Sequence, residues 1–141
     1  MRIVKTKNRK AINPVQEILN SADGLPILDI EDREWWVAYY EGESIAVAAM
    51  RVIDDMAWFS TCGVLPDYRG HGLQKKLIKK RLDYAKKLGV KEVYTYTVNG
   101  NHASANSLIS CGFKHCTPPE EASGQYVGDD IDLIYWRKLF K

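Results

Sequence analysis

The spacing of apolar residues changes abruptly at residue 70, and this change constrains the fold more than any other feature of the sequence. Before it, the segments 35–40, 44–53 and 56–65 are rich in aromatic and β-branched residues and are joined by short polar turns. Such closely spaced segments predict an antiparallel meander of strands. Over residues 70–88 the apolar residues recur instead every three or four positions, which predicts one amphipathic helix with a lysine-rich outer face.

The segments on either side of this unit add further strands and helices. Near the N-terminus, Ile3-Val4 predicts an edge strand, and Asn13-Pro14 predicts an N-cap followed by proline at the first position of a short helix that ends near Asn20. Gly89 is expected to end the long helix. Beyond it the sequence predicts a strand at 91–98, a helix at 101–110, a strand that begins at Gly112-Phe113, a loop at 117–128 and a last strand at about 131–139. The predicted fold is α/β (α+β), with a mixed, mostly antiparallel central sheet flanked by helices.

Length and composition indicate one soluble domain that spans residues 1–141 and folds without a metal or a disulfide. Lys and Arg number 20 against 18 Asp and Glu, so the formal charge of +2 does not point to a nucleic-acid partner. No stretch reaches the roughly 18 apolar residues of a membrane helix, and no signal-peptide core follows the first residues. The 3 cysteines match no zinc pattern, which indicates reduced thiols in a cytoplasmic protein.

The segment Val64–Gln74 joins a predicted strand to the long helix and has the character of an anion site. Gly70 and Gly72 remove side chains where the backbone turns. The first residues of the helix then present amides without intrahelical partners, which suit a pyrophosphate together with the helix dipole. The spacing is not that of a Walker-type phosphate loop, and the third glycine of a dinucleotide fingerprint is missing.

This segment resembles the acetyl-CoA signature of the GNAT superfamily of N-acetyltransferases, in which Arg or Gln is followed by x-x-Gly-x-Gly/Ala. Arg69 and Gly72 match the pattern, whereas Gln74 stands where Gly or Ala is usual. The resemblance covers about residues 35–140. A second stretch is similar to the family's Asn-bearing helix that ends in Gly-Phe, and it reads Asn101-x-x-Ser104-x-Asn106-x-Leu108-x-x-x-Gly112-Phe113.

The resemblance implies that acetyl-CoA is the co-substrate and that its pantetheine arm lies in a V-shaped gap between two central strands. Backbone amides from Arg69 to Gln74 are expected to hold the pyrophosphate. Backbone groups of Cys62 and Val64 are expected to face the pantetheine and the acetyl carbonyl, and polar residues of the second helix to contact the far side of the arm. The full set of implied cofactor contacts is Cys62, Val64, Arg69, Gly70, His71, Gly72, Leu73, Gln74, Asn101, Ser104 and Asn106.

The sequence does not define the groups that would move protons. Many family members carry a tyrosine, thought to protonate the departing thiolate, at the position that Leu108 occupies here. Ser107, Tyr96 or water remain as alternatives. Residues 60–63 of the preceding strand contain no carboxylate, so the amine would lose its proton through water to an acidic loop residue, for which the candidates are Glu34, Asp129 and Asp130. No catalytic residue is therefore assigned.

The resemblance implies direct transfer of an acetyl group from acetyl-CoA to a primary amine on a small molecule or a protein. A covalent route through Cys62 is chemically conceivable, but the family transfers directly. The missing tyrosine and carboxylate leave an alternative of another class, a non-catalytic CoA-binding or protein-interaction module on the same fold. Neither function needs a metal, a nucleic acid or a membrane, and exposed aromatic strands permit a homodimer.

Overall fold

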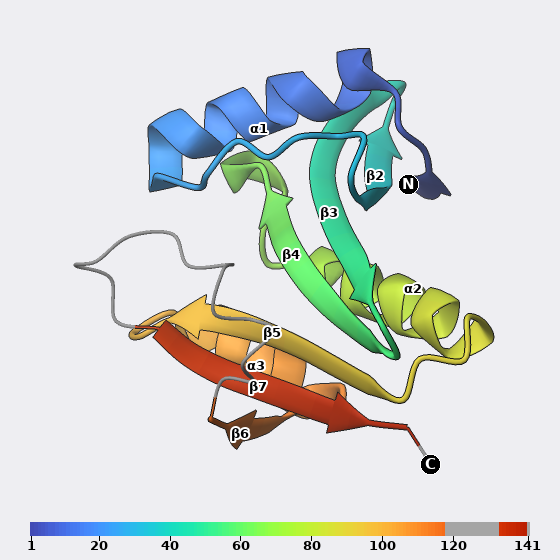
Figure 1. The fold of residues 1–141 in the computed structure, drawn as a ribbon. Coiled ribbons are helices and arrows are strands. Elements are labelled where there is room, and N and C mark those ends of the chain that lie inside the picture. The colour runs from blue at the N-terminus through green and yellow to red at the C-terminus, as the bar shows by residue number, and fades with distance from the viewer. Residues whose placement is uncertain (118–132, 141) are drawn as a thin grey trace.

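The fold is built on one mixed sheet, which the computed structural model shows for the described residues, 1–117 and 133–140 (Figure 1). Its strands are β1 (Arg2–Lys5), β2 (Glu34–Tyr40), β3 (Glu43–Ile53), β4 (Met56–Val64), β5 (Glu92–Val98), β6 (Lys114–Cys116) and β7 (Leu133–Leu139). The helices are α1 (Arg9–Asp23), α2 (Leu73–Lys87) and α3 (His102–Ser110), and a short 3₁₀ turn covers Pro66–Tyr68. The strand order is β1-β2-β3-β4-β5-β7-β6, and neighbouring strands are antiparallel except β4 and β5.

This architecture confirms the predicted mixed, mostly antiparallel sheet and the meander that forms its centre. The last strand is described from Leu133, so its predicted start near residue 131 and nearly all of the predicted loop at 117–128 lie outside the described residues. Within the part of the chain that the structure describes, no helix is both long and apolar enough to cross a membrane.

The central strands β2, β3 and β4 are buried on both faces. In β2, Trp35 and Val37 belong to a core cluster shared with α1, whereas Trp36 and Ala38 belong to a cluster shared with α2. The side chains alternate in this way because successive residues of a strand point to opposite faces of the sheet. The helices α1 and α2 therefore cover opposite faces of this half of the sheet (Figure 1).

The first helix is longer than the sequence predicts and begins earlier. α1 starts at Arg9, and its N-cap is Asn8, whose Oδ1 accepts a hydrogen bond from the Lys10 amide at 3.1 Å. The predicted N-cap at Asn13 is wrong, since Pro14 lies inside the helix. The helix tolerates the proline because it buries an apolar stripe that begins before Pro14, and this packing outweighs the one hydrogen bond that proline cannot make. The stripe consists of Ala11, Ile12, Val15 and Leu19.

The helix predicted over residues 70–88 is confirmed, although its first turn starts later. α2 begins at Leu73 because the backbone at Gly72 takes a left-handed conformation with a φ of 76°. Glycine adopts this conformation at little cost. At the other end Gly89, which has a φ of 80°, follows the helix, and its amide donates to the Lys86 carbonyl at 3.1 Å. Glycines thus bound the helix on both sides.

β4 and β5 pair at one end only. Their parallel register ends at Trp58↔Tyr94, and Thr95 Oγ1 then donates to the Phe59 carbonyl at 3.0 Å. One residue later the pairing of β4 with β3 skips Ser60, which forms a β-bulge. A bulge bends and twists the strand that carries it, so β4 turns away from β5 and the two strands diverge toward their C-terminal ends (Figure 1). The gap implied by the family resemblance starts here.

We expect Asn8→Ala to lower the free energy of unfolding by about 0.5–2 kcal/mol, because the first turn of α1 loses the acceptor for the Lys10 amide. Asn13→Ala is the matched control and should change the free energy of unfolding far less. Alanine favours a helix interior, and the Asn13 side chain only accepts a 3.3 Å hydrogen bond from Gln16 Nε2. Urea unfolding followed by circular dichroism measures both variants, and equal losses would contradict an N-cap at Asn8.

Candidate functional site

A cavity of about 680 Å³ lies beside the N-terminus of α2, within the size range of small-molecule sites. Parts of the chain that are far apart in sequence meet around it. They are the C-terminal end of α1 with Leu25, the end of β4, the turn before α2, the first turn of α2, and residues 98–107 at the start of α3. The glycine-bearing segment singled out in the sequence therefore faces a cavity and not the bulk surface.

A smaller cavity of about 110 Å³ continues from the first into the gap between β4 and β5. Cys62, Gln74, Asn101 and Ser104 line both cavities and make them one path. The inner walls are Phe59–Cys62 of β4, Thr95–Val98 of β5, Ile78 and Arg81 of α2, and Leu108 of α3. A molecule held at the start of α2 can therefore reach the interior of the sheet.

The first turn of α2 has the features of an anion site at the outer end of this path. The amides of Leu73, Gln74 and Lys75 have no hydrogen-bond acceptor among residues 1–117 and 133–140, as expected at a helix start. The first helical bond runs from the Lys76 amide to the Gly72 carbonyl at 3.2 Å, and no side chain caps the helix. Aligned amides and the positive end of the helix dipole suit a phosphate group.

Arg69 fixes the turn before α2 through its side chain. Its Nε donates to the Val64 carbonyl at 2.9 Å, and its Nη2 lies 2.5 Å from Asp23 Oδ2. The ion pair is half exposed and adds little stability, so its effect is on geometry and charge. It ties the turn to β4 and to the end of α1, and it neutralises a carboxylate that lines the cavity and would otherwise repel an anion.

Gln74, the departure from the family signature, links α2 to α3 across the path. Its Nε2 donates to Ser104 Oγ at 2.9 Å. Asn101 is the N-cap of α3, and its Oδ1 accepts a hydrogen bond from the Ser104 amide at 3.2 Å. These side chains therefore position the two helix starts relative to each other while they line the path.

Most of the contact residues predicted from the sequence lie around this path. All of them line the outer cavity except His71 and Asn106, whose side chains are exposed and belong to neither cavity. Asn106 lies on the outer side of α3 because that helix buries Leu108, two residues later, on the opposite side. A cofactor contact from the Asn106 side chain stays a prediction without support from its position. His71 stays a candidate through its backbone amide.

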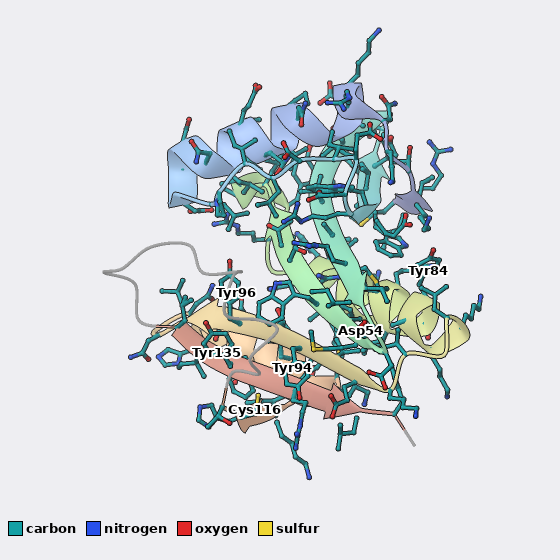
Figure 2. All side chains as sticks on the ribbon, viewed as in Figure 1. Asp54, Tyr84, Tyr94, Tyr96, Cys116 and Tyr135 are labelled. Carbon is teal, nitrogen blue, oxygen red and sulfur yellow. The ribbon has the colours of Figure 1, made fainter. Side chains whose placement is uncertain are left out.

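The groups considered for protonating a thiolate differ sharply in position. Leu108 is buried in the core and carries no proton to donate, while Ser107 lines only the outer cavity, where its Oγ donates to the Ala103 carbonyl at 3.0 Å. Tyr96 lines the inner cavity and packs beside Tyr135, with 6.3 Å between ring centroids (Figure 2). Burial, together with Tyr135, raises the pKa of the Tyr96 hydroxyl, so it keeps its proton at neutral pH.

The carboxylates considered as a general base do not gather at the path. Glu34 forms an ion pair with Lys5 at 3.0 Å and lines neither cavity. Asp129 and Asp130 lie outside the described residues. Among the residues that are described, no three His, Cys, Asp or Glu side chains lie close enough together to share a metal ion.

Arg81 is the functional candidate that the sequence reasoning missed. Its side chain is 2% exposed and donates to the Ala49 carbonyl at 3.1 Å and the Thr61 carbonyl at 3.2 Å. Its Cζ lies 4.3 Å from the centre of the Phe59 ring. The sequence does carry a signal, since Arg81 follows Leu77 by four residues and so falls within the apolar stripe of the helix.

The inner cavity also contains a thiol that is poorly ionised. Burial raises the pKa of Cys62, and the nearby positive charge of Arg81 opposes this effect in part. Ser60 and Thr61, the neighbouring residues at the bulge, have buried hydroxyls with no hydrogen-bond partner in the described part of the chain. The bulge thus leaves polar groups unpaired at the place where it opens the sheet.

The family comparison agrees with this geometry. The model of the acetyltransferase (GNAT) family matches residues 7–113, which include both sequence signatures. The chain belongs to the GNAT family of acetyltransferases. A search of curated proteins gives no match.

Solved structures of other acetyltransferases share the fold of this GNAT chain. The structure of an acetyltransferase from Bacillus subtilis in complex with CoA superposes with a TM-score of 0.78 at 18% identity, and the match covers 99% of each chain. The ribosomal-protein-alanine N-acetyltransferase from Brucella melitensis has a TM-score of 0.76 at 21% identity, over 99% of this chain and 100% of that one. The ribosomal-protein-S18-alanine N-acetyltransferase from Escherichia coli has a TM-score of 0.77 at 21% identity, over 96% and 91%. At these identities the likeness shows the fold alone.

We expect iodoacetamide to alkylate Cys62 more slowly at neutral pH than it alkylates a free thiol, because the raised pKa leaves less reactive thiolate. The rate should rise with pH beyond the point at which a free thiol levels off. CoA should slow the reaction further, since Cys62 lines both cavities. Mass spectrometry of the Cys62 peptide follows the modification, and labelling as fast as that of a free thiol would contradict the raised pKa of this group.

Proposed function

We propose that this protein is an N-acetyltransferase that moves an acetyl group from acetyl-CoA directly to a primary amine. The observation that carries the proposal is the path from the start of α2 into the gap between β4 and β5. Its outer end offers unpaired amides to a pyrophosphate, and its inner end is narrow. A long cofactor with an anionic head and a thin reactive arm fits such a path.

In the proposed complex the arm takes the place of a missing strand. Beyond Phe59 the edge of β4 that faces β5 has no strand partner among the described residues. Backbone amides and carbonyls on such an edge are strong hydrogen-bonding groups that need partners. The amide groups of pantetheine can pair with them, which brings the thioester beside Cys62.

The acceptor is proposed to approach over β5 and β7, on the side of the sheet away from α2 and α3, where no described helix packs. A cluster of buried and half-buried side chains lies there, and all of its members belong to strands, with none from the described helices. Trp58 and Tyr96 pack in it with ring centroids 5.8 Å apart. Tyr96, which Figure 2 shows near Tyr135, also lines the inner cavity, so it connects this face with the proposed thioester position.

The transfer step needs no covalent intermediate on the protein. The amine nitrogen attacks the thioester carbonyl, backbone amides of β4 stabilise the developing oxyanion, and CoA leaves. Holding both reactants in the gap supplies much of the rate acceleration. The small inner cavity suits an acetyl group better than a long acyl chain. The second candidate, a non-catalytic CoA-binding module, is favoured by one observation, the absence of an assigned acid at Leu108.

We expect acetyl-CoA to raise the melting temperature of the protein. At a ligand concentration a hundredfold above its Kd, it should add about 2.7 kcal/mol to the free energy of unfolding.

Gln74→Glu should weaken acetyl-CoA binding at least about tenfold, because it places a negative charge at the phosphate site. The same change should not harm folding, since an acidic residue is favourable in the first turn of a helix. The donor to Ser104 Oγ is lost, but the new carboxylate can accept a hydrogen bond from the Ser104 hydroxyl.

Gln74→Met is the neutral control and should keep more affinity than Gln74→Glu. Isothermal titration calorimetry measures the affinities, and thermal unfolding without ligand checks the folds. Equal affinities for acetyl-CoA in the two variants would count against a pyrophosphate at the start of α2.

A panel of primary amines, with free thiol release as the signal, separates the enzyme from the binding module. The enzyme should release CoA only when both substrates are present. We expect Cys62→Ala to retain most of this turnover, because direct transfer does not use the thiol. Binding of acetyl-CoA without turnover across peptide N-termini, lysine side chains and small amines would favour the module.

A further inference from the structure

Arg81 brings a positive charge to the inner cavity, and no carboxylate of the described residues balances it. None of the ion pairs within residues 1–117 and 133–140 includes it. Its guanidinium is held by three backbone carbonyls and by the Phe59 ring. A neutral amide side chain can also donate to carbonyls, so what arginine adds is a permanent charge. Burying an unbalanced charge is costly, which favours a negative group that enters the site during the reaction.

Within residues 1–117 and 133–140, the groups around Arg81 that can titrate are thiols and a phenol. Cys62 of β4 and Cys111 at the end of α3 lie close enough to interact with its charge, and Tyr96 of β5 lines the same cavity. Arg81 lowers the pKa of the Cys62 thiol, against the larger effect of burial. A sulfur atom in this gap therefore already experiences the guanidinium charge, and under the proposed function the sulfur of CoA enters the same gap.

We propose that Arg81 stabilises the CoA thiolate that leaves in the transfer step, in a site where Leu108 replaces the usual proton donor. Both side chains line the inner cavity. The amine nitrogen forms a bond to the carbonyl carbon, the C–S bond breaks, and its electron pair remains on sulfur. The surplus proton of the amine passes to water. The fixed charge compensates the thiolate in a site of low polarity, so no proton has to reach the sulfur in that step.

Arg81 also supports the bulge, and this structural role can be separated from the electrostatic one. The carbonyls of Ala49 and Thr61 that it binds belong to residues paired immediately beside the skipped Ser60. Support of the bulge needs hydrogen-bond donors, which glutamine supplies. Stabilisation of a thiolate needs charge, which glutamine lacks. Arg81→Gln and Arg81→Met therefore form an informative pair.

The inference rests on the proposed function, since it requires CoA in the gap, and the experiment measures the two separately. Calorimetry first establishes that CoA and desulfo-CoA bind to the wild type and to each variant. The ultraviolet absorbance of the thiolate then gives the pKa of bound CoA as pH is raised. Desulfo-CoA serves as the blank, so that ionisation of the protein's own thiols and tyrosines cancels. Lys80→Gln removes an exposed charge from the neighbouring position of α2 and is the control.

In complexes with the wild type and with Lys80→Gln, the thiol of bound CoA should have a pKa below its value in solution. Arg81→Gln and Arg81→Met should both raise the pKa of the bound thiol by at least about one pH unit, and kcat should fall while CoA affinity changes little. A bound-thiol pKa in the wild type at or above the solution value would overturn the proposal. The proposal would also be overturned if the bound-thiol pKa and kcat of Arg81→Gln equalled those of the wild type while those of Arg81→Met did not. That pattern would assign Arg81 to support of the bulge alone. Failure of CoA to bind any form would instead refute the proposed function.

Discussion

The end of the pairing between β4 and β5 is the constraint on which the rest of the site depends. The parallel ladder stops at Trp58↔Tyr94, and the bulge at Ser60 then bends β4 away from its neighbour. A continuous ladder would have satisfied the backbone along this edge and left no room inside the sheet. Among the described residues, the fold instead keeps a strand edge without a partner strand and two buried hydroxyls without a hydrogen-bond partner, those of Ser60 and Thr61. This interruption of the hydrogen-bonded ladder is what creates the inner cavity.

One helix supplies positive charge at both ends of the path. The first turn of α2 presents its free amides to the outer cavity, and Arg81, about two turns further along, reaches the inner one. Arg69 cancels the charge of Asp23 at the outer end, so the helix terminus acts on an incoming anion without opposition from that carboxylate. Under the proposed function, the cofactor places a pyrophosphate near one positive group and develops a thiolate near the other.

The departures from the family signature have structural consequences of their own. Gln74 replaces a small residue and uses its side chain to join α2 to α3 through Ser104. Leu108 removes a proton donor and extends the apolar core. A buried cation in the same cavity offers a different way to manage charge on a leaving group. Membership of the family therefore does not by itself define how this chain would handle the proton and the thiolate.

The sequence alone determined the elements and their order, because hydrophobic period and glycine position are local properties. It predicted the meander, the long helix up to Gly89 and the glycine-bearing turn that faces the outer cavity. It misplaced the start of α1, where burial of Ala11 and Ile12 overrides the local signal of Asn13-Pro14. Only the tertiary structure decided which side chains share the inner cavity, because Arg81, Tyr96 and Leu108 come from three different elements. Their meeting depends on a bend in β4 that arises from strand register, and register is a relation between segments that no single segment encodes.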